Sequence, residues 1–127
     1  MENSARWTVP ARRESVPVAR RWVVRALAGR ELPADLIATV ELLVSELVTN
    51  AVRHAQTEAV SIAVEVDPDG VRVEVQDDDP LPPSLIAAGP GDPGGRGLGM
   101  LGQAGARWGV SDHGPAGKSV WFVLARE

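Results

Sequence analysis

The segment from Leu32 to Ala55 constrains the fold most, because it predicts one long amphipathic helix. Apolar residues recur in it at three- and four-residue steps, which places their side chains on one face of an α-helix. They are Ile37, Val40, Val44, Leu47 and Ala51. Pro33 suits the first turn, where its missing N–H costs no hydrogen bond. The apolar face of this helix needs a second layer to cover it.

The neighbouring segments predict that layer. Alternating apolar and polar residues indicate a short edge strand at 7–11 and two strands at 60–66 and 71–75, joined as a hairpin by Pro68-Asp69-Gly70. We also expect helices over 15–28 and near 98–104, and strands near 108–110 and 120–124. Because the helices cluster instead of alternating with strands, we predict an α+β fold. It is a two-layer α/β sandwich whose mixed sheet is covered on one face by helices.

Composition limits the classes of function. The length suits a single domain spanning 1–127, and 44% apolar residues are enough for a core. A net charge of −4 argues against direct nucleic-acid binding, and no apolar run reaches the roughly 20 residues that span a bilayer. With no cysteine and no signal peptide, we expect a cytoplasmic protein. Arginines near the N-terminus form either a solvated helix face or a surface for an acidic partner; they are Arg12, Arg13, Arg20, Arg21 and Arg25.

Three polar residues lie along the border of the long helix. Glu46 and Asn50 are one helical turn apart, and Arg53 follows on the same side. A carboxylate and an amide oxygen suit a magnesium ion that carries phosphates, and Glu46 could deprotonate a hydroxyl. An equally open alternative is that these three residues form a solvated flank of the helix and have no further role.

Two further segments could bind a ligand. Asp77, Asp78 and Asp79 end a strand, where a carboxylate could accept a hydrogen bond from an adenine amino group. They could instead bind a metal or form a solvated turn. The glycine-rich run at 94–99 precedes a predicted helix, so its backbone amides could bind phosphate, with Arg96 as a second contact. A flexible linker has the same composition.

Two segments match the letters of known nucleotide-binding motifs but lack the structural context that those motifs require. Residues 97–102 fit G-x-G-x-x-G, but they follow a glycine- and proline-rich loop where the dinucleotide motif requires a strand. Gly117-Lys118-Ser119 resembles the end of a P-loop, yet a predicted strand follows it instead of a helix.

Taken in order, these segments resemble the GHKL (histidine-kinase-like) ATP-binding domains, in particular the actinomycete anti-sigma-factor serine kinases. ELVTNAVRHA, VEVQDDDPLPP, GRGLGM and GKSVWF carry the resemblance over nearly the whole chain. It implies a Bergerat-type fold, the cofactors ATP and Mg²⁺, and a flexible ATP lid at about 80–97. It also implies a sigma factor and an anti-anti-sigma (STAS-type) protein as partners, and a possible homodimer.

The resemblance assigns roles by position. Glu46 is the catalytic base or polarising carboxylate, Asn50 binds the metal, and Asp77 anchors adenine. The remaining nucleotide contacts are expected from Arg53, Arg96, Gly97, Leu98, Gly99 and Ser119. The chain departs from the general D-x-G-x-G pattern, with Asp79-Pro80-Leu81 where the glycines would begin. Three hypotheses stay open: a protein-serine kinase, an ATP-dependent binding module without phosphoryl transfer, and an interaction domain that has lost nucleotide affinity.

Overall fold

The structure is a computed structural model that describes residues 4–54, 57–79 and 101–126. Two helices, α1 (Ser15–Leu27) and α2 (Ala34–His54), follow the first strand, β1 (Ser4–Pro10). Then come β2 (Ala59–Asp67), β3 (Gly70–Asp77), β4 (Arg107–Asp112), a 3₁₀ turn at Gly114–Ala116 and β5 (Lys118–Ala125). Each predicted element of the described segments is present, with ends shifted by a few residues. The predicted lid at 80–97 lies outside the described residues.

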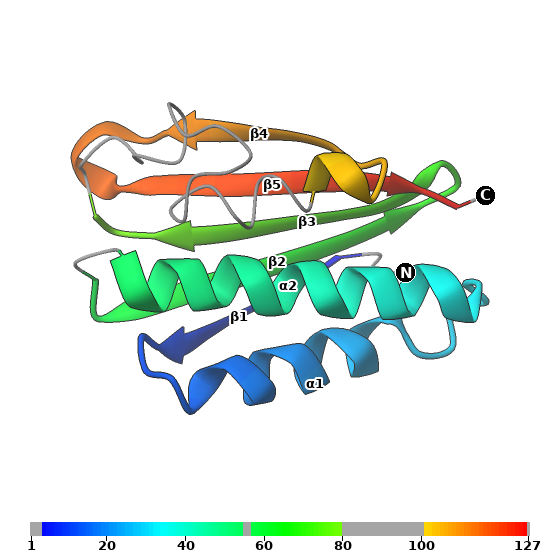
Figure 1. The fold of residues 1–127 in the computed structure, drawn as a ribbon, viewed down its shortest axis with the longest axis horizontal. Coiled ribbons are helices and arrows are strands. Elements are labelled where there is room, and N and C mark those ends of the chain that lie inside the picture. The colour runs from blue at the N-terminus through cyan, green and yellow to red at the C-terminus, as the bar shows by residue number, and fades with distance from the viewer. Residues whose placement is uncertain (1–3, 55–56, 80–100, 127) are drawn as a thin grey trace.

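The strands form one five-stranded sheet in the order β1-β2-β3-β5-β4. Every pairing within it is antiparallel, so the expectation of a mixed sheet is wrong in this detail. The cause is the connectivity between β1 and β2. The two helices that link these strands run in opposite directions and return the chain to the end of the sheet where β1 stops, so β2 runs antiparallel to β1 (Figure 1). Both helices lie on one face of the sheet, which confirms the two-layer α+β sandwich (Figure 1).

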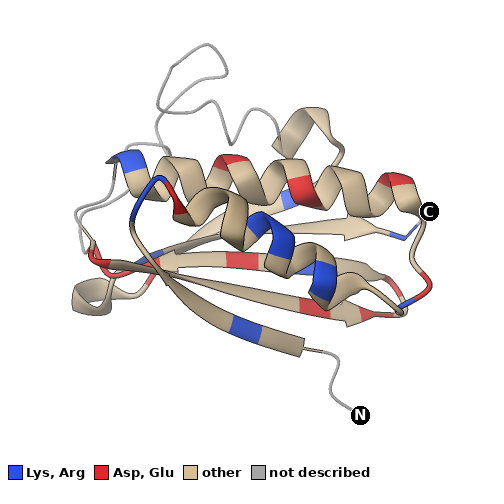
Figure 2. Cartoon of the chain, turned by 90° about the horizontal axis from the view of Figure 1, so that it is seen from below, with Lys and Arg blue, Asp and Glu red and all other residues tan. Residues whose placement is uncertain are grey.

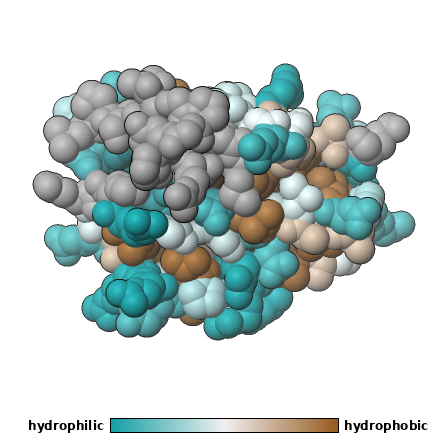
Figure 3. Space-filling model, in the orientation of Figure 1, coloured by the Kyte–Doolittle hydropathy of each residue, from teal (hydrophilic) through white to brown (hydrophobic). Residues whose placement is uncertain are grey.

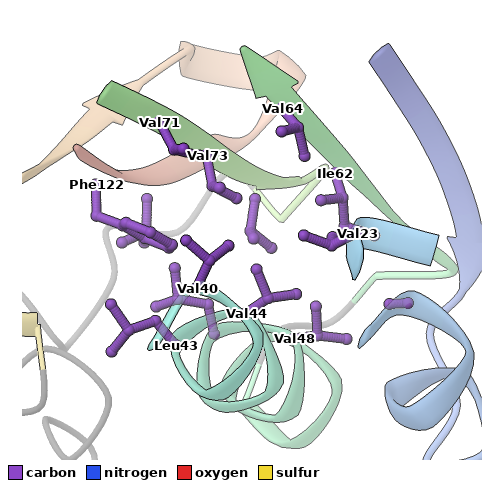
Figure 4. Packing of buried hydrophobic residues seen from close by; sticks show 14 of the residues in the cluster. Val23, Val40, Leu43, Val44, Val48, Ile62, Val64, Val71, Val73 and Phe122 are labelled. Carbon is purple, nitrogen blue, oxygen red and sulfur yellow. The ribbon is translucent and has the colours of Figure 1, made fainter. Parts of the chain in front are cut away.

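The core fills the space between α2 and the sheet. Alternate residues of the central strands point to the helices, as a strand's two-residue period requires. Those of β2 and β3 are Val60, Ile62, Val64, Val66, Val71, Val73 and Val75, and all are buried. Phe122 of β5 is fully buried among them, facing Val40, Leu43 and Val44 of α2 (Figure 4). The stripe that predicted α2 is therefore its core-facing side.

Helix α1 packs beside α2 near the outer edge of the sheet. It ends before Gly29, whose φ of +80° is the left-handed conformation that stops a helix at low cost. Trp22 of α1 meets Trp7 of β1 with ring centroids 5.7 Å apart. Large apolar side chains do reach the surface at Trp7, Val18, Leu42 and Trp108, and Figure 3 shows hydrophilic residues between the hydrophobic patches. No helix within the described ranges is long and apolar enough to cross a membrane.

Candidate functional site

The C-terminal half of α2 brings two of the predicted residues to the border of the core. Asn50 is 7% exposed, and its Nδ2 has no hydrogen-bond partner. Glu46 lies one turn earlier and is half-buried; no described residue pairs with its carboxylate. A buried polar group without a partner is costly, and such groups are rare in folded proteins. The flank at Asn50 therefore offers hydrogen-bonding capacity that the described protein does not use.

The end of β3 and the start of β5 supply a second group of polar residues. Cross-strand pairing sets Asp77 opposite Lys118, and Lys118 Nζ donates to Asp77 Oδ1 at 2.9 Å. Asp79 also lies beside this lysine, with its Oδ2 3.9 Å from Nζ. All three side chains are at least nine-tenths buried. These acids thus form a buried ionic cluster and not a solvated turn. The cluster lies at the same end of the molecule as the C-terminus of α2 (Figure 1).

Backbone contacts fix the position of this cluster. Gly117 has φ +113°, and a Cβ built on it would lie 2.0 Å from the carbonyl oxygen of Asp77. Only glycine permits so close an approach of the two strand ends. From the other side, Thr57 and Asp78 are joined by a hydrogen bond between their side chains, and the N–H of Asp78 donates to Thr57 Oγ1 at 3.3 Å. The chain before β2 thereby holds the segment that follows Asp77.

Ser119 does not share the face of Asp77. Successive strand residues point to opposite faces, so Ser119 projects to the side away from the helices. There its Oγ donates to Glu74 Oε2 at 2.5 Å and lies 2.8 Å from His113 Nε2. Burial raises the pKa of Glu74, but hydrogen bonds from Ser119 and Arg72 and the charges of Arg72 and Arg6 outweigh it, so the pKa is lowered. The basic residue beside Asp77 is Lys118, which the sequence reasoning missed.

Arg53 is exposed and lines a groove of about 650 Å³ between the start of α1 and the end of α2. Arg12 and Arg13 line the same groove, and Figure 2 shows basic residues in the loop that leads into α1 and at the end of α2. Arg96, Gly97, Leu98 and Gly99 lie outside the described residues. The described part of the chain holds no group of three acidic or histidine side chains able to bind a metal.

Comparison with known proteins identifies the fold. The family described as the histidine kinase-like ATPase domain matches residues 9–124. The chain belongs to this family. It thereby belongs to the GHKL class that the sequence motifs indicated, and the match includes the helix with Asn50 and the strands of the ionic cluster. Among curated proteins, no sequence matches the chain significantly.

Solved structures share this fold. A structure of the RsbU and RsbW domains of Rv1364c from Mycobacterium tuberculosis is 24% identical, with a TM-score of 0.65. The match covers 98% of this chain and 33% of that one. The histidine kinase domain of the EL346 blue-light activated histidine kinase from Erythrobacter litoralis is also 24% identical, with a TM-score of 0.59. That match covers 93% of this chain and 62% of the other. The histidine kinase-like ATPase domain thus spans only part of each solved chain.

The donor set fits a nucleotide of this ATPase family. Among the described residues, Nδ2 of buried Asn50 has no hydrogen-bond partner and the carboxylate of Glu46 has no ion pair, while the buried carboxylate of Asp77 lies beside the ammonium group of Lys118. The resemblance found in the sequence assigned roles to Asn50, Glu46 and Asp77. Lys118 lies in the GKSVWF segment of that resemblance, but it received no role, because its approach to Asp77 depends on the strand register.

Proposed function

We propose that this histidine kinase-like ATPase domain binds Mg-ATP and acts as an anti-sigma factor with protein serine/threonine kinase activity. Its substrate would be a serine or threonine of an anti-anti-sigma partner of the STAS type. The observation that carries the proposal is Nδ2 of buried Asn50, which has no hydrogen-bond partner among the described residues and can donate to a phosphate oxygen. It lies one turn from Glu46, whose carboxylate no described residue pairs with, in a chain of this ATPase family. The likeness to a structure that includes an RsbW domain supports the regulatory part.

Each residue has a chemical task in this proposal. The side-chain oxygen of Asn50 is a suitable hard ligand for magnesium. Glu46, free of a described ion pair, can accept or orient the proton of a partner hydroxyl. Asp77 accepts a hydrogen bond from the adenine amino group. When bound, Mg-ATP supplies the phosphoryl group for transfer.

The partner's chemistry is suggested by the groove beside Arg53. Its lining includes the apolar residues Ala11, Val16, Pro17 and Val52 and the basic residues Arg12, Arg13 and Arg53. None of these arginines is ion-paired within the described part of the chain. Uncompensated basic side chains beside an apolar lining favour an acidic protein segment with apolar anchors. A cytoplasmic location and a homodimer belong to the same proposal.

A second candidate is an ATP-dependent binding module without phosphoryl transfer. It is favoured by the isolation of Glu46, because no described residue orients its carboxylate, whereas a catalytic base is commonly held by a further group. In this alternative, nucleotide occupancy alone would control the partner, and Asn50 would matter while Glu46 would not.

Transfer of label from γ-labelled ATP to candidate anti-anti-sigma proteins tests both candidates. We expect transfer by the wild type, loss in Glu46→Ala with Mg-ATP binding retained, and loss of both in Asn50→Ala. Glu65→Ala is the matched control, because Glu65 is an exposed carboxylate on β2. No transfer to any cognate partner despite ATP binding would rule out the kinase. Partner regulation that survives Glu46→Ala but fails in Asn50→Ala would favour the binding module.

A further inference from the structure

Lys118 is the only lysine in a chain that otherwise uses arginine for every basic side chain except its two histidines. It is also buried, with 8% of its surface exposed, as the first residue of β5. Lysine is among the residues least often found buried unless it is paired. The position of the single lysine in the ionic cluster therefore needs a physical reason.

The contacts of the cluster are unevenly shared between the two oxygens of Asp77. Oδ1 accepts from Lys118 Nζ at 2.9 Å and from the N–H of Asp79 at 2.9 Å. Oδ2 has no partner among the described residues. Lys118 also donates to the carbonyl oxygen of Asp79 at 3.4 Å. One oxygen is thus held by two donors while the other remains available as an acceptor.

We infer that Lys118 is a positioning residue for base recognition: it fixes Asp77 by one oxygen and leaves the other for the amino group of adenine. This inference rests on the proposed ATP binding. Lysine suits the task because its ammonium is a point charge that can hold a single oxygen. The planar guanidinium of arginine tends to take both oxygens of a carboxylate, which would remove the acceptor.

Purely structural pairing of Lys118 with Asp77 predicts a different behaviour. A structural pair would affect the stability of the strand ends and the binding of every nucleotide alike. A positioning residue affects the part of the affinity that comes from the adenine amino group. The comparison of ATP with purine riboside triphosphate, in which hydrogen replaces that amino group, separates the two.

The decisive measurement is calorimetric titration of wild type, Lys118→Met and Lys118→Arg with the magnesium complexes of both nucleotides. We expect the wild type to prefer ATP by about tenfold, the effect of one hydrogen bond to a charged group. In Lys118→Met the carboxylate is no longer fixed, so the preference should fall to about twofold or less. Lys118→Arg keeps the charge but should also lose the preference. Arg72→Met, which removes a cation from the opposite face of the sheet, should retain it.

Several outcomes would overturn the inference. An unchanged preference in Lys118→Met or in Lys118→Arg would leave Lys118 a structural residue. Tighter ATP binding by Lys118→Met would show that the ammonium competes with adenine. These results leave the proposed ATP binding intact, whereas a wild type that binds neither nucleotide would refute both.

A second measurement uses the wild type alone, so it does not depend on the variants folding. With ¹⁵N-labelled lysine, Lys118 gives the chain's single lysine side-chain signal in NMR. We expect ATP to shift this signal more than purine riboside triphosphate does, because only ATP engages the carboxylate that Lys118 holds. Equal shifts, or no shift at saturation with ATP, would refute the positioning role.

Discussion

Replacing Gly117 by alanine should be among the most damaging single changes in this domain. Gly117 has φ +113° and ψ −151°, a region that essentially only glycine occupies, and entering it costs about 1–3 kcal/mol for another residue. The new Cβ would also lie 2.0 Å from the carbonyl oxygen of Asp77 and 2.6 Å from Cα of Asp78. The strand ends would therefore have to separate by more than an ångström where Lys118 meets Asp77.

Separating the two strand ends costs free energy in addition to the strained backbone conformation at residue 117. Weakening a buried ion pair and the adjoining ladder bonds brings the expected loss of unfolding free energy to about 4 kcal/mol or more. Domains of this size have about 5–15 kcal/mol in total, so most of the stability would be lost. Any Gly117→Ala protein that still folds should bind Mg-ATP poorly, because Asp77 is displaced.

Gly114→Ala is a matched control for this prediction. Gly114 also has a positive φ, +62°, but a Cβ there would meet nothing within 4 Å. Gly114→Ala should lower the unfolding free energy by about 1 kcal/mol, because only the left-handed backbone conformation disfavours alanine there. Urea unfolding followed by tryptophan fluorescence and circular dichroism would compare the two variants. If their unfolding free energies lie within about 1 kcal/mol of each other, the contact with Asp77 does not require glycine and the reasoning fails.

Four other changes test the core, the outer face, the site and the groove. Phe122→Ala, at a fully buried position, should lower the unfolding free energy by about 3–5 kcal/mol in denaturant titrations. The pKa of Glu74 lies below its ordinary 4.5, so its stabilising effect is present above that pH and is lost as the pH falls through the lower, folded value. The stability difference between wild type and Glu74→Gln should shrink accordingly in unfolding curves at decreasing pH. Asn50→Leu removes an unpaired buried amide, so it should raise the unfolding free energy by about 1 kcal/mol while calorimetry detects no Mg-ATP binding. Charge reversal of Arg12 and Arg13 together should abolish binding of the acidic partner but leave ATP affinity within about twofold, as paired titrations would show.

The sequence predicted the fold well because its periodic patterns record burial directly. The stripe from Ile37 to Ala51 and the alternating valines of β2 and β3 are the residues that fill the core. The sequence pattern predicted strand direction less well. We expected a mixed sheet, whereas every pairing in the sheet is antiparallel. Alternation shows which side chains are buried but not which strand lies beside which, because pairing is settled by connections and packing between distant segments.

Contacts between the candidate site residues were predictable only where these residues are close in sequence. Glu46 and Asn50 share one helix, so their spacing alone sets them side by side. The contact between Asp77 and Lys118 joins residues 41 apart, and it exists only in the register that also pairs Gln76 with Ser119. A shift of one position would place Ser119 instead of Lys118 on the face of Asp77. The strand register therefore decides which basic or hydroxyl group meets the carboxylate. Gly117 contacts the end of β3 at this point, so the same close approach that makes glycine obligatory also sets Lys118 against Asp77.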